Sequence, residues 1–386
     1  MHRHEFLYIM HESVEDIPIT VICGPLGAGK TTLVNRLLKN SGERRIAVIV
    51  NDMGEVNIDA ELVEDETEEG VIDLSNGCIC CRLQEDLVTE VTRLADQRSF
   101  DHLVVEASGI SEPIPIARSL TVGLEEKSLS DRFDLDTTVS VIDAYGFWKA
   151  FDPEESLPDS VPGPKRPLTE VLVDQIEFCD VLLLNKCDMV PEKALNAVEA
   201  AIEELQPRAE IHRTRYSQIN PNDVLDTGLF DFEEAKRQQG WKRALANGQD
   251  KAGNENHDHS HKHSGEAVSA ATAHGVESFV YYRDRPFYPT RFNSWLDEWR
   301  GNIIRAKGFA WISSRPGTVL GISQAGPEVQ AGPIGRWGDD EPMTRLVFIG
   351  RDLNEVDLTA ELDDCLATAE EQAAEDLEDP FPRNSD

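Results

Sequence analysis

The stretch IPITVICGPLGAGKTT, residues 17–32, decides the fold of this chain. Its first part, Ile17–Cys23, is a short apolar run of the kind that forms a buried strand. The pattern G-x-x-x-x-G-K-T follows from Gly24 to Thr31, and Lys30 to Lys39 then carries leucines at helical spacing. In a glycine-rich loop between a strand and a helix, backbone N–H groups close round phosphate and the helix N-terminus adds positive potential. The stretch therefore predicts a site for nucleotide phosphates.

Residue types within this loop predict separate roles. Lys30 is expected to reach the terminal phosphates and to act in catalysis, and the Thr31 hydroxyl is expected to bind Mg2+. The other loop residues expected to contact the nucleotide are Gly24, Gly27, Ala28, Gly29 and Thr32.

Further apolar runs alternate with helical patterns along the first 240 residues. This alternation predicts an α/β fold with a doubly wound, mostly parallel sheet, in which ligands lie at the carboxyl ends of the strands. The expected strands are 45–51, 71–74, 102–106, 138–143 and 180–185, and an amphipathic helix is expected at 82–96.

The tetrad Asn185-Lys186-Cys187-Asp188 ends one of these strands. The Asp188 carboxylate can accept hydrogen bonds from N1–H and the exocyclic amine of guanine. Adenine has no N1–H and would leave the carboxylate unpaired, which is costly in a buried site. Asn185, Lys186 and Asp188 are therefore expected to select GTP over ATP, and the first domain is expected to be a P-loop GTPase.

Three acidic residues and one glycine extend this site. Glu106 ends the strand at 102–106 and is expected to reach Mg2+ through water or to position the attacking water. Gly109 follows closely and is expected to give a backbone N–H to the γ-phosphate. Asp52 and Glu55 lie where a switch segment is expected, and they are candidates for catalytic or metal-coupling residues. The alternative is that both are ordinary loop acids of an acidic protein.

Three cysteines in four residues, Cys78, Cys80 and Cys81, lie between the phosphate loop and the tetrad. Thiolates favour Zn(II), Cu(I) and, less strongly, Co(II). Three protein ligands leave one coordination position open, which suits a site that releases its metal, whereas a structural zinc is closed by four. The alternatives are inert buried thiols and a redox dithiol. Cys23, Cys179 and Cys365 lie in apolar runs and are expected to belong to the core.

The pattern changes after residue 240. Residues 241–274 read as a linker, with four histidines that predict a weak accessory metal site or are chance residues of a polar segment. Strands at 275–282, 303–312, 318–324 and 345–349, with helices at 290–300 and 353–368, predict a smaller α+β domain over 275–369. Residues 1–16 are expected to be a flexible N-terminus, 17–240 the GTPase domain, and 370–386 an acidic, disordered tail. The four histidines are His257, His259, His261 and His263.

The composition is strongly acidic, with 72 Asp and Glu against 37 Lys and Arg and a net charge of -35 over 386 residues. Such a surface disfavours nucleic acid and anionic membrane as partners, because both are polyanions. It resembles the surfaces of proteins from salt-rich cytoplasms. The alternative is an acidic protein with an acidic tail from a cytoplasm of ordinary salt concentration. No apolar run approaches the ~20 residues that span a bilayer, and seven scattered cysteines make no disulfide framework. These features predict a cytoplasmic location.

The chain resembles the CobW-like GTPase metallochaperones, in a likeness that covers most of its length. The resemblance rests on Gly24 to Thr32, NDMGEVNID at 51–59, NGCICC at 76–81 and Asn185 to Asp188. In the second domain it rests on RPFYPTRF at 285–292, GFAWISSRPG at 308–317 and GRW at 335–337. One departure is Tyr288, where many relatives carry histidine.

The resemblance implies slow GTP hydrolysis coupled to delivery of Zn(II), or in some branches Co(II), to a client protein. It also implies that Cys78, Cys80 and Cys81 are the metal ligands, and the client is expected to bind the second domain. Two alternatives stay open. One is a cobalt carrier for cobalamin or nitrile hydratase maturation, and the other is a zinc buffer with structural GTP.

Overall fold

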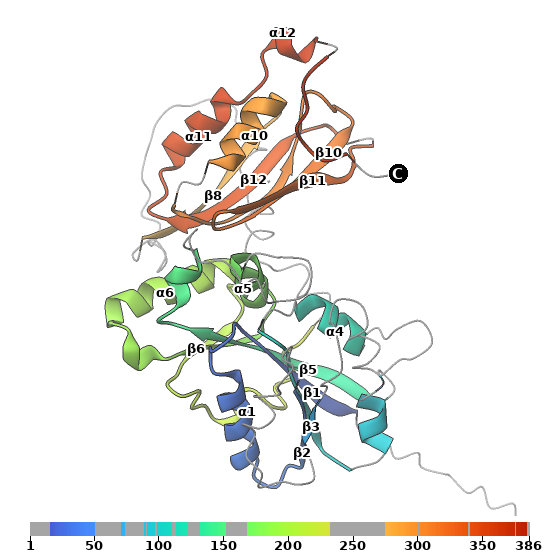
Figure 1. Ribbon diagram of the computed structural model, residues 1–386, viewed down its shortest axis with the longest axis vertical. Helices are drawn as coiled ribbons and strands as arrows, with labels where there is room; N and C mark the ends of the chain where they lie inside the picture. The colour runs from blue at the N-terminus through green and yellow to red at the C-terminus, as the bar shows by residue number, and fades with distance from the viewer. Residues whose placement is uncertain are drawn as a thin grey trace, which may run out of the picture.

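The computed structural model describes residues 16–50, 71–73, 89, 91–96, 99–109, 113–121, 132–151, 168–231, 275–298, 301–338, 340–374 and 376–383. Two sheets organise these residues, and Figure 1 shows one above the other. The α/β class with a smaller α+β second part, expected from the sequence, is confirmed. None of the helices in the described ranges has the length and hydropathy needed to cross a bilayer.

The first sheet is parallel, with seven strands in the order β3-β2-β4-β1-β5-β6-β7. Because β1 pairs with β4 on one side and β5 on the other, the loop after β1 leaves the middle of the carboxyl edge. The strands are β1 Ile17–Cys23, β2 Ile46–Val50, β3 Val71–Asp73, β4 His102–Glu106, β5 Phe133–Asp143, β6 Val181–Asn185 and β7 Glu210–Arg213. The helices are α1 Lys30–Lys39, α4 Pro113–Thr121, α5 Leu168–Glu177 and α6 Glu192–Leu205, with short 3-10 turns η1 Phe147–Phe151, η2 Cys187–Met189 and η3 Pro221–Asp223.

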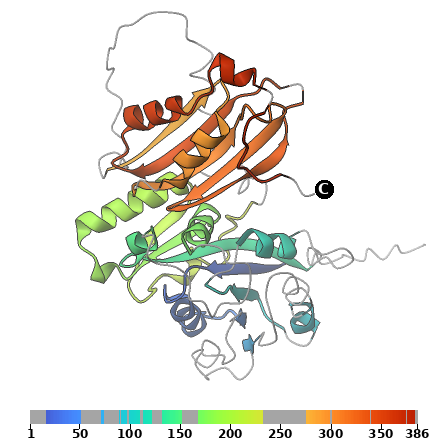
Figure 2. The same cartoon turned by 45° about the horizontal axis from the view of Figure 1, so that its top comes forward.

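The second sheet is antiparallel, in the order β11-β10-β9-β12-β8. Helices cover one face of it, as Figure 2 shows, over a core that includes the closely stacked rings of Phe287 and Phe292, 4.0 Å between centroids. The strands are β8 Val276–Arg283, β9 Ile303–Ala310, β10 Thr318–Ala325, β11 Glu328–Arg336 and β12 Thr344–Arg351. The helices are α10 Pro289–Asp297, α11 Glu355–Asp364 and α12 Ala369–Gln372.

The other face of the second sheet rests on α5 and α6 of the first (Figure 1). One hydrophobic cluster runs through this junction, with Ile176 and Leu205 from the first part and Ala325 and Ile349 from the second. Burying apolar surface from both sides fixes the two sheets to each other.

Four details differ from the sequence prediction. β5 begins at Phe133 rather than at residue 138, and β7 and β11 were not predicted at all. The helix expected at 353–368 is shorter, since α11 covers only Glu355–Asp364, and a separate helix, α12, starts after the predicted range with a capping box from Thr368 and Glu371. The prediction of a disordered tail is wrong for residues 376–383, since the Phe381 side chain is only 3% exposed and packs in the core of the second sheet. Asp379 also forms an ion pair with Arg315 at 2.6 Å.

Candidate nucleotide site

The phosphate loop is shaped by two glycines at which any other residue would be strained. Gly24 and Gly29 have φ of 140° and 113°, in the region that favours glycine. A Cβ on Gly24 would lie 2.2 Å from the Val141 carbonyl oxygen, and one on Gly29 would lie 2.5 Å from the Asn185 amide nitrogen. Among the described residues no side chain caps α1 at Gly29, so the first turn of α1 presents backbone N–H groups to the loop. The loop residues Gly24, Gly27, Ala28, Gly29, Lys30, Thr31 and Thr32 are thus brought together at the middle of the carboxyl edge.

Lys30 and Thr31 begin α1 within this loop. The Lys30 Nζ donates hydrogen bonds to the carbonyl oxygens of Gly24 and Pro25, at 2.9 and 3.2 Å. The Thr31 hydroxyl donates to Glu106 Oε1 at 3.0 Å, and the Glu106 side chain is buried at the carboxyl end of β4. Hard oxygen donors of this kind suit Mg2+. The donor set of Thr31 and Glu106 therefore fits a magnesium ion beside the phosphate loop.

Asn185 joins the base-reading loop to the phosphate loop. Its amide Nδ2 donates to Ala28 O at 2.8 Å and to Ser217 Oγ at 3.1 Å. Its Oδ1 accepts from Ser217 N at 2.9 Å and from Thr214 Oγ1 at 3.1 Å. Two donors and two acceptor positions are thereby used within the protein. The geometry gives Asn185 a structural role, and its contact with guanine stays a prediction.

Lys186 and Asp188 complete the tetrad. Lys186 has φ of 62°, and its Nζ forms an ion pair with Asp143 Oδ2 at 2.8 Å, which fixes the loop to the end of β5. Asp188 lies in η2 with an exposed side chain, open to a base from solvent. Its exposure is compatible with the predicted reading of guanine.

Sequence reasoning missed three residues of this site: Asp143, Thr214 and Ser217. The last two follow β7, and Ser217 Oγ also donates to Gly29 O at 2.9 Å. β7 is too short and polar to predict, so no local pattern marks the segment after it. Asp143 was predicted at the end of a strand, and this position at the carboxyl edge was the only indication that it could belong to the site.

Gly109 lies against the phosphate loop from the other side. A Cβ on Gly109 would come within 2.7 Å of the Leu26 backbone nitrogen. The structure therefore brings Gly109 close to the predicted phosphate position, together with Glu106 three residues earlier. The remaining predicted site residues, Asp52, Glu55, Cys78, Cys80, Cys81, His257, His259, His261 and His263, lie outside the described residues.

Three of the other cysteines are core residues, as expected. Cys23, Cys179 and Cys365 are buried. Burial raises the pKa of the Cys23 thiol to about 12, against the influence of Lys30, and it also raises the pKa of Cys179. Such thiols stay protonated near neutral pH and are poor metal ligands. Within the described part of the chain, no group of three or more His, Cys, Asp or Glu side chains is arranged to hold a metal ion.

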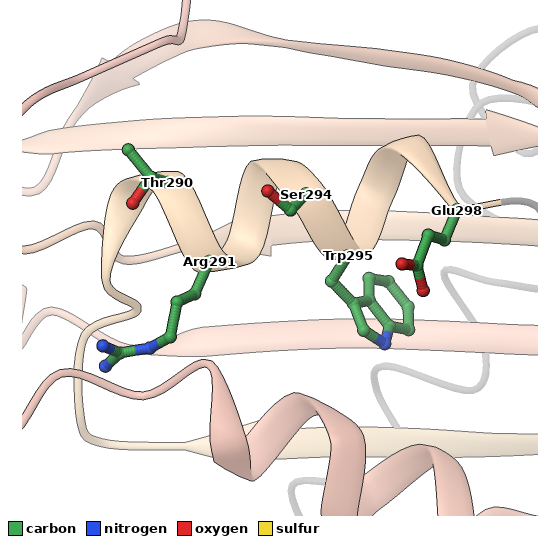
Figure 3. A pocket seen from close by; sticks show the side chains of 5 residues that line it. All are labelled: Thr290, Arg291, Ser294, Trp295 and Glu298. Carbon is green, nitrogen blue, oxygen red and sulfur yellow. The ribbon is translucent and has the colours of Figure 1, made fainter.

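A surface pocket of about 330 Å³ lies along α10 of the second sheet (Figure 3). Its basic lining residue, Arg291, is held by an ion pair with Glu371 at 2.7 Å. The pocket is wide open and contains none of the predicted site residues. Its lining residues are Thr290, Arg291, Ser294, Trp295 and Glu298.

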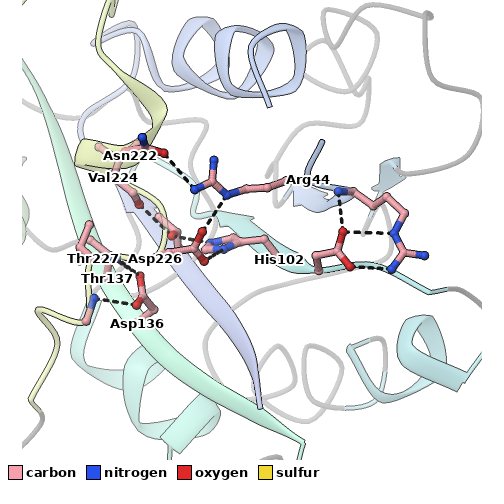
Figure 4. Close-up of polar contacts among 12 residues, drawn as sticks. Arg44, His102, Asp136, Thr137, Asn222, Val224, Asp226 and Thr227 are labelled. Carbon is pink, nitrogen blue, oxygen red and sulfur yellow. Dashed lines mark hydrogen bonds and ion pairs between the residues drawn. The ribbon is translucent and has the colours of Figure 1, made fainter. Parts of the chain in front are cut away.

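A second polar cluster lies at the opposite, amino edge of the first sheet (Figure 4). The buried His102 ring contacts Asp226 Oδ1 at 3.0 Å and Thr20 Oγ1 at 2.9 Å. Arg44 donates to the same Asp226 carboxylate at 2.7 Å. Burial lowers the pKa of His102, and the hydrogen bond to Asp226 opposes that effect. The cluster fixes the part of the chain around Asp226 at this amino edge, away from the phosphate loop.

Comparisons with known proteins agree with this geometry. Residues 18–213 match the family model described as CobW/HypB/UreG, nucleotide-binding domain, and residues 276–366 match the cobalamin synthesis protein cobW C-terminal domain. The zinc-regulated GTPase metalloprotein activator 1 of Dictyostelium discoideum is 36% identical over 92% of this chain and 80% of its own length. The zinc chaperone CobW of Pseudomonas aeruginosa is 30% identical over 92% of this chain and 93% of its own.

Among solved structures, that of the Zn(II)-bound YjiA GTPase from E. coli is 23% identical. It covers 91% of this chain and 99% of its own, with a TM-score of 0.42. The family match across the whole nucleotide-binding half, with the phosphate loop and the tetrad at one edge of a parallel sheet, shows that the chain belongs to the CobW/HypB/UreG family and is a P-loop GTPase.

Proposed function

We propose that this GTPase binds Zn(II) through Cys78, Cys80 and Cys81 and transfers it to a client metalloprotein under the control of GTP. Two relatives that align with most of the chain support the metal, since one is named a zinc chaperone and the other a zinc-regulated activator of metalloproteins. Thiolate chemistry supports it as well, because three soft ligands suit Zn(II) and leave a position for exchange.

The topology of the first sheet carries this proposal. β3 ends at Asp73, which pairs with Val50, and Val50 pairs in turn with Glu106. Neighbouring strands lie about 4.8 Å apart, so Asp73 lies about 10 Å from Glu106 along the carboxyl edge. Cys78 follows Asp73 by five residues, which span at most about 18 Å when extended. This short chain length supports a position of the Cys78 thiol near the residues that we expect to surround the γ-phosphate.

The nucleotide machinery of the proposal rests on the site described above. Lys30 neutralises charge on the terminal phosphates, and Gly109 gives its N–H to the γ-phosphate. Asp188 reads guanine. Thr31 and Glu106 would hold a Mg2+ ion, which when bound supplies charge neutralisation at the transferred phosphoryl group. Glu106 also orients the attacking water.

The remaining parts of the proposal concern coupling and delivery. Asp52 and Glu55 couple the nucleotide state to the thiols. The histidines at 257, 259, 261 and 263 form a weak accessory metal site. The client binds the second domain, taken as residues 275–369, which the linker at 241–274 joins to the GTPase domain at 17–240.

The test is the affinity for Zn(II) and Co(II), measured by competition with a chelating dye at high KCl. The measurement is made with Mg-GTP analogue and again with Mg-GDP. A matched control replaces Cys23, Cys179 and Cys365, the buried thiols, with Ala. The triple Cys78→Ala, Cys80→Ala, Cys81→Ala variant should lose the tight site and its dependence on nucleotide, whereas the control should keep both.

Equal metal affinity in the two nucleotide states would overturn the gating and leave a zinc buffer that binds GTP. Tighter, stoichiometric Co(II) binding would favour a cobalt carrier. Loss of metal binding in the Cys23/Cys179/Cys365 variant alone would move the site away from the CxCC run.

A further inference from the structure

Helix α5 carries an unusual number of buried polar side chains. Glu170, Gln175 and Glu177 are all buried in a helix of ten residues. The helix lies between the two sheets (Figure 1), so its polar groups cannot turn to solvent. Buried polar groups of this kind need partners within the protein, and the partners lie in two different places.

One face of α5 holds the second sheet. Glu170, Asp174 and Glu177 follow one another at helical spacing and so share a face. Arg305 of β9 reaches them: its Nε and Nη2 bond the two Glu177 oxygens at 2.9 and 3.2 Å, and Nη2 lies 3.7 Å from Asp174. Gln330 of β11 donates to Glu170 at 2.8 Å.

The pair of Arg305 and Glu177 is fully buried, with both side chains only 1% exposed. A buried ion pair depends on good geometry, because removal of either partner leaves an uncompensated charge. The two-pronged contact therefore holds the second sheet in one position on α5.

A different side chain of α5, Gln175, contacts the candidate nucleotide site. Gln175 is 1% exposed, and its Nε2 donates to the Gly109 carbonyl oxygen at 3.5 Å. Gly109 in turn lies against Leu26 of the phosphate loop, with no room for a Cβ between them. The segment from Glu106 to Gly109 is therefore held between α5 and the phosphate loop.

We infer that Gln175 is a positioning residue for GTP hydrolysis and that the Glu177–Arg305 contact sets its position. Gln175 itself is not among the residues expected to contact the nucleotide. It acts by fixing Gly109, and through the short segment behind it Glu106, where the γ-phosphate and the attacking water are expected. A displacement of about 1 Å at such residues can cost on the order of a hundredfold in rate. A partner that shifts the second sheet would change hydrolysis through the same helix.

The first test compares Gln175→Met with Gln206→Met. Gln206 is a matched control, since it is also a buried amide and donates to α5 itself, at Glu177 O and 2.6 Å, but does not touch Gly109. Single-turnover GTP hydrolysis, GTP affinity and thermal melting are measured for both variants. Gln175→Met should slow hydrolysis roughly tenfold with GTP affinity within about twofold of wild type, and Gln206→Met should leave the rate within about twofold.

A wild-type rate in Gln175→Met would overturn the inference. So would an equal loss of rate in Gln206→Met, because any damage to α5 would then have the same effect. The division between rate and affinity separates positioning from general destabilisation, which would lower both.

The second test addresses the link to the other sheet with the double variant Glu177→Gln, Arg305→Met, which removes both charges together. Hydrolysis should slow at least about fivefold with unchanged GTP affinity. A wild-type rate in a variant that melts as one cooperative unit would overturn the role of the Glu177–Arg305 contact.

Discussion

Replacement of Asn185 by Ala should weaken GTP and GDP binding by the same factor. The Asn185 amide makes four hydrogen bonds that join Ala28 of the phosphate loop to Thr214 and Ser217 after β7. Each such bond contributes about 1 kcal/mol net. Because the four share one side chain and are not additive, their joint loss should cost about 3 kcal/mol. Both loops are predicted to contact the nucleotide in either state, so affinity for GTP and GDP should each fall about a hundredfold.

The assay is fluorescence titration with N-methylanthraniloyl derivatives of GTP and GDP. Thr214→Val serves as a graded control, because it removes one of the four bonds and should cost tenfold or less. Asn196→Ala serves as a neutral one, since Asn196 lies on α6 and accepts only from Arg213 at 2.6 Å among the contacts described. Wild-type affinity in Asn185→Ala would refute the reasoning, because the two loops would then hold the nucleotide without the Asn185 hydrogen bonds. A loss of affinity confined to GTP would also refute it, because Asn185 would then act on the γ-phosphate.

Three further predictions follow from the described contacts. Asp188→Asn should reduce the preference for GTP over ATP by about a hundredfold or more in competition binding, and an unchanged preference would place guanine reading elsewhere. Stability should fall as the pH drops below about 6.5, because burial lowers the pKa of His102 and the unfolded chain then binds more protons than the folded one. His102→Gln should flatten that slope in urea unfolding between pH 5 and 8, and a slope identical to wild type would contradict the role of His102. Phe381→Ala should destabilise the second core by about 3 kcal/mol in thermal unfolding, whereas a neutral effect would mean that the tail does not pack there in solution.

The fold was predictable where the local signal was strong. β1 and α1 have the predicted bounds, because an apolar run, a glycine loop and a leucine-spaced helix each mark their own limits. β11 was missed because it contains Gly332, Pro333 and Gly335, residues that disfavour strands. Its pairing with β10 along one edge overrides that local preference, with an irregularity beside Pro333. Such tertiary pairing leaves no trace in a single sequence.

The candidate site divides in the same way. The phosphate loop and the tetrad were predictable from their sequence motifs, and the structure places both at the carboxyl edge of the first sheet. Ser217 and Asp143 were not predicted as site residues because their importance lies in partners 32 and 43 residues away. The acidic composition of the tail predicted disorder, yet Phe381 and the Asp379–Arg315 pair are enough to hold residues 376–383.

The central position of β1 has a consequence for synthesis on the ribosome. Of the strands in the described residues, β1 is made first, but its neighbours β4 and β5 end only at Glu106 and Asp143. At about 5–20 residues per second, the ribosome needs roughly 5 to 25 s to deliver both. For that time the apolar run Ile17–Cys23 has two unpaired edges, a form that invites pairing with other chains. The nascent protein is thus open to aggregation through β1 until β4 and β5 have been made, and co-translational chaperones can act during this interval.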